Sequence, residues 1–292
     1  MTFDDNKADH RNPNPNNWLS KFSSNTFSQF GEDGIVEKIF SILPDVSKWC
    51  VEFGAWDGKH FSNAHLLLFQ KGWSGVLIEA DSYRFKELCQ TYHDNTRVTC
   101  LNKKVSFDGE NVLDNLLSHT SVPKDFDLLS IDIDGNDFHA WKSVIDFRPK
   151  VVIIEFNNTI PNHTEFVQEA NYSVNQGSSL LSLYKLAKGK GYELVVVTDF
   201  NAFFVDAAYF PLFEIADNSP DAINNNQRYI THVFQLFDGT MVWQGNLRLL
   251  WHDLRIKPER LQILPKCFRY FPENKTSWLK RFMFSWYKKL RL

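Results

Sequence analysis

Continuous runs of apolar residues alternate along the chain with segments whose apolar residues recur at helical spacing. The run Val151-Val-Ile-Ile154 is apolar at every position, which is typical of a strand covered on both faces of a sheet. The segment from Ile35 to Leu43 instead follows the helical period and ends at Pro44. Residues 21–213 are therefore predicted to form an α/β domain around a doubly wound sheet.

The predicted elements follow one another in strict alternation. Strands are expected at residues 49–54, 75–80, 97–101, 127–133, 150–156 and 192–198. Helices are expected between them, at about 61–71, 82–92, 111–118, 137–146 and 178–190. A further strand, Ala202–Val205, follows the last of these too closely for a helical crossover, so the two must be antiparallel. The pattern predicts a seven-stranded, mostly parallel sheet that closes with an antiparallel hairpin.

The two ends of the chain differ from this domain. Residues 1–20 are polar and broken by prolines, and they are predicted to be flexible. Residues 214–292 are predicted to form an extension with a β-hairpin and a basic amphipathic helix at 276–292. That helix has two interpretations: packing on the domain with its lysines in water, which is the simpler one, or peripheral contact with an anionic membrane surface.

Composition narrows the class of protein. The length of 292 residues suits one large domain with an appendage, and the formal net charge of -3 argues against a nucleic-acid binder that acts through bulk charge. The four cysteines have no C-x-x-C spacing, and no apolar run approaches the ~18 residues of a membrane span. The expected location is the cytoplasm, with the inner face of the membrane as an option, and the oligomeric state stays open.

The first two predicted strands end in residues suited to an adenosine-containing cofactor. The first ends in Glu52-Phe-Gly-Ala-Trp-Asp-Gly58 and the second in Glu79-Ala-Asp81. Glycine lets the backbone approach a ligand, and a carboxylate accepts hydrogen bonds from ribose hydroxyls. For Asn63 and for the segment around Gln29, helix capping is the alternative to cofactor binding. Asp81 is expected to cap the following helix. The predicted cofactor-binding residues are Glu52, Gly54, Ala55, Gly58, Asn63, Glu79, Ala80 and Gln29.

A second group of polar residues ends the two central strands. Asp132 and Asp134 are two apart and would point to the same side of an extended segment, where Glu155 could join them. These three carboxylates could hold a hard divalent cation such as Mg²⁺. Alternatively, Asp132, Asp134 or His139 acts as a general base without metal. Asp137 is expected to cap the following helix.

Six segments within about residues 27–213 carry a family resemblance: Ser28-Gln-Phe-Gly-Glu-Asp-Gly34, Val51-Glu-Phe-Gly-Ala-Trp-Asp-Gly58, Gly72-Trp-Ser-Gly-Val-Leu-Ile-Glu-Ala-Asp81, Ser130-Ile-Asp-Ile-Asp-Gly-Asn-Asp137, Val152-Ile-Ile-Glu-Phe-Asn157 and the helix and strand at 178–195. Together they resemble the FkbM-like S-adenosylmethionine-dependent methyltransferases, many of them encoded among polysaccharide-synthesis genes. The chain has Trp56 where the glycine-rich loop common in methyltransferases often has its middle glycine, and it has Lys103-Lys104 where small residues are expected.

The resemblance implies a class I methyltransferase fold, S-adenosylmethionine as methyl donor and a sugar hydroxyl of a polysaccharide, glycan or precursor as acceptor. Two other functions are considered. An NAD-dependent oxidoreductase shares the glycine turn and the carboxylate, but the G-x-G-x-x-G spacing is missing and the closing hairpin departs from that plan. A non-catalytic methyltransferase-like scaffold at a membrane surface is the other alternative.

Overall fold

The computed structural model describes residues 15–271 and 277–291 and divides the chain into two compact units, Met1–Asn225 and Asn226–Leu292. The division comes later than the predicted boundary after residue 213, because Ile215 and Ile223 are buried in the core of the first unit. The described part of the N-terminal segment also differs from the prediction. It forms a 3-10 helix, η1 (Pro15–Phe22), with Leu19 fully buried, while residues 1–14 lie outside the described part.

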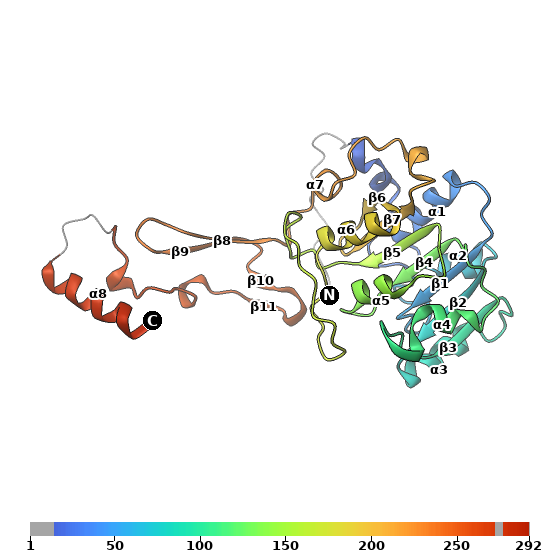
Figure 1. The fold of residues 1–292 in the computed structure, drawn as a ribbon, viewed down its shortest axis with the longest axis horizontal. Helices are drawn as coiled ribbons and strands as arrows, with labels where there is room; N and C mark the ends of the chain where they lie inside the picture. The colour runs from blue at the N-terminus through green and yellow to red at the C-terminus, as the bar shows by residue number, and fades with distance from the viewer. Residues whose placement is uncertain (1–14, 272–276, 292) are drawn as a thin grey trace. The chain divides into compact units, whose positions relative to one another are not determined.

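The first unit is built on a seven-stranded sheet in the order β3-β2-β1-β4-β5-β7-β6 (Figure 1). Every neighbouring pair is parallel except those of β7, which is antiparallel to both β5 and β6. This confirms the predicted doubly wound sheet with its antiparallel closing hairpin, the plan of the class I methyltransferases. The strands are β1 (Trp49–Phe53), β2 (Ser74–Glu79), β3 (Val98–Asn102), β4 (Leu128–Ile131), β5 (Val151–Glu155), β6 (Tyr192–Val197) and β7 (Asn201–Asp206).

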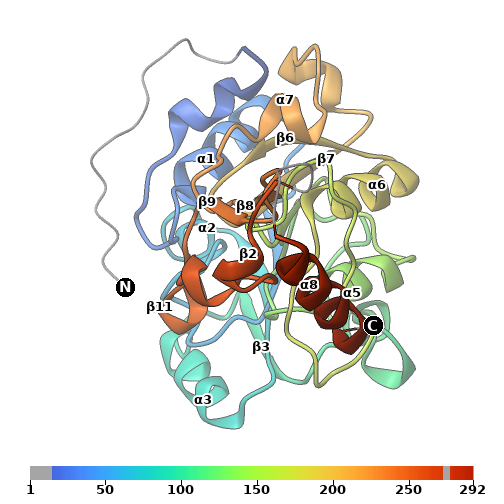
Figure 2. The same cartoon turned by 90° about the vertical axis from the view of Figure 1, so that its left-hand side faces the viewer.

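Helices cover both faces of the sheet: Figure 2 shows α1 and α3 on one side and α5 and α6 on the other. The strands between them are continuous apolar runs, and Val151–Ile154 is fully buried as the pattern predicts. The order of strands reverses between β1 and β4, and in open α/β sheets ligands bind beyond the carboxyl ends of the strands at such a point. The helices are α1 (Glu32–Ile42), α2 (His65–Gln70), α3 (Ser82–Thr91), α4 (Leu113–Ser118), α5 (Asp137–Ser143), α6 (Leu180–Lys190) and α7 (Pro220–Ile223), with 3-10 helices η2 (Gly109–Asn111) and η3 (Phe210–Phe213).

A buried ion pair joins the central strands at their amino ends, away from the carboxyl ends that form the candidate site. The carboxylate of Asp127, which has no exposed surface, accepts hydrogen bonds from Lys150 Nζ at 2.7 Å, from the Ser47 hydroxyl at 2.7 Å and from the Trp49 amide at 3.1 Å. Asp127 and Lys150 immediately precede β4 and β5, and Ser47 and Trp49 lie at the start of β1. The pair therefore aligns the three strands whose other ends form the candidate site.

The second unit contains small antiparallel pairs and one long helix. β8 (Thr231–Gln235) pairs with β9 (Met241–Gly245), which confirms the predicted hairpin, and β10 (Arg248–Leu249) pairs with β11 (Leu254–Arg255). The 3-10 helices η4 (Leu250–His252), η5 (Pro258–Arg260) and η6 (Lys266–Phe268) precede α8 (Trp278–Arg291). No helix among the described residues is both long and apolar enough to cross a membrane.

Candidate functional site

The turn after β1 brings the carboxyl ends of three strands close together. Gly54 has a φ of +76°, and a Cβ there would lie 1.6 Å from the backbone oxygen of Asp132 after β4. Its amide donates to the carbonyl of Ile78 in β2 at 3.1 Å. Only glycine fits both the positive φ and the close approach to Asp132. Its backbone is exposed, so a ligand can approach it.

Glu79, the last residue of β2, holds this turn with its side chain. One carboxylate oxygen accepts from the amide of Trp56 at 2.8 Å and the other from the amide of Asp81 at 2.7 Å. Each oxygen has a second lone pair, so the half-buried carboxylate can still accept a ligand hydroxyl. Asp81 caps α3 by accepting from the amides of Tyr83 and Arg84, as the sequence predicts.

Trp56 shapes the surface of the turn. Its φ is +49°, its side chain is 42% exposed, and the guanidinium of Arg84 lies 4.8 Å from its ring. Its ring meets that of Phe61, also exposed, at 6.4 Å. Ala80 is exposed at the end of β2, where its carbonyl accepts from Asn102 at 3.2 Å. An aromatic surface therefore borders the site in place of a bare loop.

Several predicted cofactor residues lie behind this surface and not on it. Glu52 is buried, and its two oxygens accept from the Ser62 hydroxyl at 2.6 Å and the Asn63 amide at 2.8 Å. Asn63 is buried as well, and its Nδ2 donates to Ser130 Oγ in β4 at 3.1 Å. Gly58 is packed so tightly that a Cβ would lie 2.4 Å from Leu88. These residues therefore position the turn, and the expectation that they contact the cofactor stays a prediction.

Ala55 is buried too, and its amide donates a hydrogen bond to the carbonyl of Ile78 at 3.1 Å. It therefore belongs with the residues that hold the turn.

The loop that contains Gln29 is held over the same edge of the sheet. A single oxygen of buried Asp33 accepts from the amides of Thr26, Phe27 and Ser28 at 2.6–2.9 Å. The carbonyl of Phe27 accepts from the amide of Phe61 at 3.0 Å, which joins this loop to the one after β1. Gln29 itself is exposed. Asp33 therefore holds the loop in shape, and the exposed side chain of Gln29 can contact a ligand.

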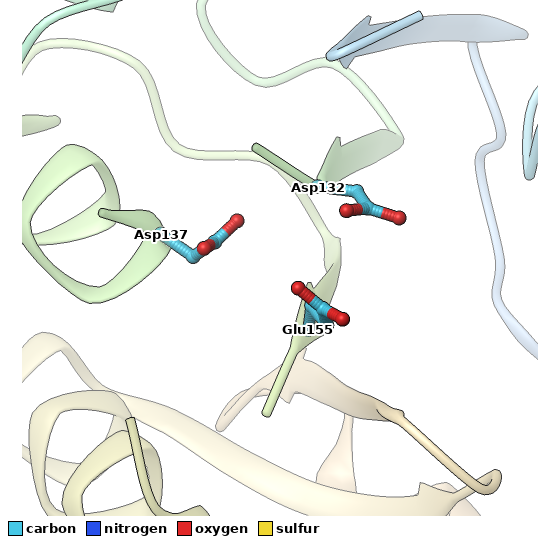
Figure 3. Close-up of side chains that lie close together, drawn as sticks. All are labelled: Asp132, Asp137 and Glu155. Carbon is cyan, nitrogen blue, oxygen red and sulfur yellow. The ribbon is translucent and has the colours of Figure 1, made fainter. Parts of the chain in front are cut away.

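A group of three carboxylates lies where β4 and β5 end (Figure 3). One oxygen each of Asp132, Asp137 and Glu155 lies within 4.8 Å of the others. The prediction named Asp134 as the third member, and the structure corrects it to Asp137. β4 already ends at Ile131 and Asp134 has a φ of +55° in a turn, so the alternation of an extended strand does not apply there.

Asp137 also does not cap α5 in the way the sequence predicts. Asn136 occupies the N-cap position, and Asp137 turns back to accept from the amides of Ile133 at 2.9 Å and Gly135 at 2.8 Å. The sequence contains a signal for this contact between Asp137 and the preceding loop. An acid in the first turn of a helix, just after a glycine turn, can bind the loop before it as readily as its own helix.

The electrostatics of the three carboxylates favour bound protons or a cation. Crowding by protein atoms raises the pKa of Glu155 well above the ordinary value, and the neighbouring acids raise it further. The pKa of Asp132 is raised by the same two causes, although its side chain reaches solvent and water therefore weakens the effect of crowding. Burial raises the pKa of Asp137 to about 6, although its two amide hydrogen bonds oppose the rise. Such a group can hold a proton near neutral pH or give it up to a divalent cation.

The structure pairs His139 with other residues. Its Nε2 lies 2.8 Å from the carbonyl of Gln168, and its ring packs 5.5 Å from Phe107. Positions two apart on a helix do not face one another, so Asp137 and His139 diverge on α5. Phe107 in turn stacks on Tyr172 at 4.5 Å, and the ammonium of Lys104 lies 4.8 Å from that ring. Lys104 and Tyr172 line an open recess after β3, together with Ser106, Asp108, Glu110 and Asn111.

Glu52 should make stability depend on pH. Burial raises its pKa from 4.5 to about 7, so between these values the folded chain binds more protons than the unfolded one, and stability falls as pH rises. In Glu52→Gln we expect the fall between pH 5 and pH 8 to be smaller by about 3 kcal/mol. Urea unfolding at both pH values measures it. Glu87→Gln, at a half-exposed surface site on α3, should keep the wild-type fall, and an unchanged fall in Glu52→Gln would contradict the assignment.

Comparison with known proteins yields structural likeness alone. The chain matches no protein-family model and no curated protein. Among solved structures it is similar to an S-adenosylmethionine-dependent methyltransferase from Aquifex aeolicus, at 9% identity and a TM-score of 0.38 over 65% of this chain and 98% of that chain. It is also similar to the N-terminal domain of EvdMO1 with S-adenosylhomocysteine bound, at 10% identity and a TM-score of 0.38 over 63% of this chain and 81% of that chain. The fold is therefore defined by the strand order of the sheet and not by these likenesses.

Proposed function

We propose that this chain is an S-adenosylmethionine-dependent methyltransferase whose donor binds at the carboxyl ends of β1 and β2. The observation that carries the proposal is the exposed Gly54 turn, held against Asp132 on one side and bound to the Glu79 carboxylate through the amide of Trp56 on the other. The turn exposes its backbone at Gly54, and Glu79 keeps lone pairs for two ribose hydroxyls. The adjoining aromatic surface of Trp56 and Phe61 suits the apolar parts of a ligand.

The acceptor side of the site is formed by Asp132 and Glu155, beside Asp137. S-adenosylmethionine supplies an electrophilic methyl group when it is bound. Asp132 then accepts the proton of an acceptor hydroxyl, and because its pKa is raised above the ordinary value, its carboxylate is a stronger base than a free one. Asp137 holds the loop from Ile133 to Gly135, so it keeps Asp132 in position. In the proposal the acceptor is a carbohydrate hydroxyl, as the resemblance implies.

A divalent cation is the second form of this mechanism. The three carboxylate oxygens are ligands that Mg²⁺ accepts, and a cation would relieve the repulsion between Asp132, Asp137 and Glu155. A bound cation lowers the pKa of a coordinated hydroxyl, so the carboxylates would then act as ligands and not as the base.

Calorimetric titration with S-adenosylhomocysteine tests the proposal. We expect the wild-type chain to bind it and Glu79→Gln to bind at least about tenfold more weakly, because one acceptor oxygen and the charge are lost. The matched control is Glu87→Gln, on α3 and paired with Arg84 at the surface, which should bind as the wild type does. Absence of S-adenosylhomocysteine binding, or binding of NAD in its place, would contradict the proposal. Repeating the titration with Mg²⁺ distinguishes the two mechanisms, since only the metal form predicts a cation-binding signal.

A further inference from the structure

The helix α8 exposes its apolar side chains to solvent. Its large apolar residues on this side are between 50% and 80% exposed. They fall on an arc of the helix, because they recur at spacings of three and four. We refer to this arc as the apolar face, and its members are Trp278, Leu279, Phe282, Met283, Trp286 and Leu290.

Other residues of α8 attach it to the rest of the second unit. Phe284 and Tyr287 are only partly exposed, and their rings lie 5.4 Å and 5.2 Å from that of Phe268. The Tyr287 hydroxyl also donates to the carbonyl of Ile263 at 3.0 Å. The helix therefore packs through these two residues and leaves the apolar face uncovered within its own unit. This arrangement is the reverse of a helix that packs through its apolar face with lysines in water.

The charge on α8 is entirely positive. Residues 278–291 contain five Lys and Arg and no acidic residue. The charge extends to the whole unit: residues 226–292 hold 13 Lys and Arg against 4 Asp and Glu, a formal charge of +9 in a chain whose total is -3. The second unit is thus strongly basic and the first strongly acidic.

We infer that α8 is a binding site for the surface of an anionic lipid bilayer. Tryptophan and phenylalanine on one face with Lys and Arg around it is the composition of helices that lie in the membrane interface. The apolar face enters the boundary between headgroups and acyl chains, while Lys280 and Lys289 contact anionic headgroups. At 14 residues the helix is about 21 Å long, too short to span ~30 Å of hydrocarbon, so it lies in the plane of the surface.

Charge argues against pairing between two copies of this helix. Two copies of α8 would place five cations opposite five, with no acidic side chain on either helix to compensate them. A bilayer with acidic lipids supplies negative charge and an apolar layer at once.

Sedimentation of the full chain with vesicles tests the inference. We expect binding to vesicles of phosphatidylcholine mixed with phosphatidylserine, much weaker binding to phosphatidylcholine alone, and a loss of binding as salt is raised. Phe282→Ser with Trp286→Ser should weaken binding at least about tenfold, and so should Lys280→Glu with Lys289→Glu.

Matched variants separate α8 from general properties of the chain. Lys257→Glu with Arg260→Glu makes the same change in charge at exposed sites in and beside η5, and Phe69→Ser with Ile145→Ser removes exposed apolar residues from the first unit. Both should bind within about threefold of the wild type. Thermal unfolding of every variant identifies any that fails to fold.

Three results would overturn the inference. The first is that the wild-type chain does not sediment with anionic vesicles, and the second is that the α8 variants bind them as well as the control variants do. The third is a dimer, in sedimentation equilibrium without vesicles, that the α8 substitutions dissociate, because a second copy then covers the apolar face.

Discussion

Replacing Gly54 by alanine is expected to lower the free energy of unfolding by about 4 kcal/mol. The φ of +76° disfavours any side chain, which accounts for about 1–2 kcal/mol. The new Cβ would also lie 1.6 Å from the carbonyl oxygen of Asp132, and since that atom is backbone, β1 and β4 must separate to make room. Chemical denaturation of the wild type and the variant measures the loss.

Gly72→Ala is the matched control for this experiment. Gly72 has a φ of +71°, and a Cβ there would meet nothing within 4 Å, so only the backbone strain remains. We expect a loss of about 1–2 kcal/mol. Equal losses in the two variants would show that the close approach of β1 and β4 does not limit position 54.

Replacing Lys150 by methionine is expected to lower the free energy of unfolding by about 3–5 kcal/mol. The ammonium of Lys150 lies 2.7 Å from Asp127, whose carboxylate is wholly buried and would lose its cation. Asp127 also accepts hydrogen bonds from Ser47 and Trp49, so the ion pair aligns β1 with β4 and β5. Without it, the ends of β4 and β5 that lead to Asp132 and Glu155 should lose their alignment. Denaturation measures the stability, and S-adenosylhomocysteine binding reports on the site.

Lys185→Met provides the comparison. Its ion pair with Glu165 is more than half exposed at both side chains, so its loss should change stability by less than about 1 kcal/mol. The double variant Asp127→Asn with Lys150→Met should recover much of the stability, because no unpaired charge is then buried. A loss in Lys150→Met no larger than that in Lys185→Met would contradict the role of the buried pair.

The architecture of the first unit could be predicted closely from the sequence. The strands of the sheet lie within two residues of their predicted bounds, since continuous apolar runs between turns mark strands that are covered on both faces. The antiparallel β7 also followed from local information: the connection after β6 is too short for a helical crossover.

The candidate site was predicted less completely. Its position at the ends of β1, β2, β4 and β5 followed from the order of the strands, but the membership of the acidic group did not. Asp134 was grouped with Asp132 by the alternation of a strand, whereas the chain turns at Asp134 and returns with Asp137. Likewise, Glu52 and Asn63 have the residue types of ligand contacts, and only their burial assigns them to holding the turn.

The sequence by itself determined the alternation of strands and helices, the closing hairpin and the glycine turn with its acidic neighbour, because periodicity, connection length and residue type are local properties of a chain. The tertiary structure decided which side chains face outward. Asp137 joins Asp132 and Glu155 only because a turn redirects it, and α8 packs through Phe284 and Tyr287 only because Phe268 and Ile263 lie beside it. Both outcomes depend on contacts between segments that the local pattern does not specify.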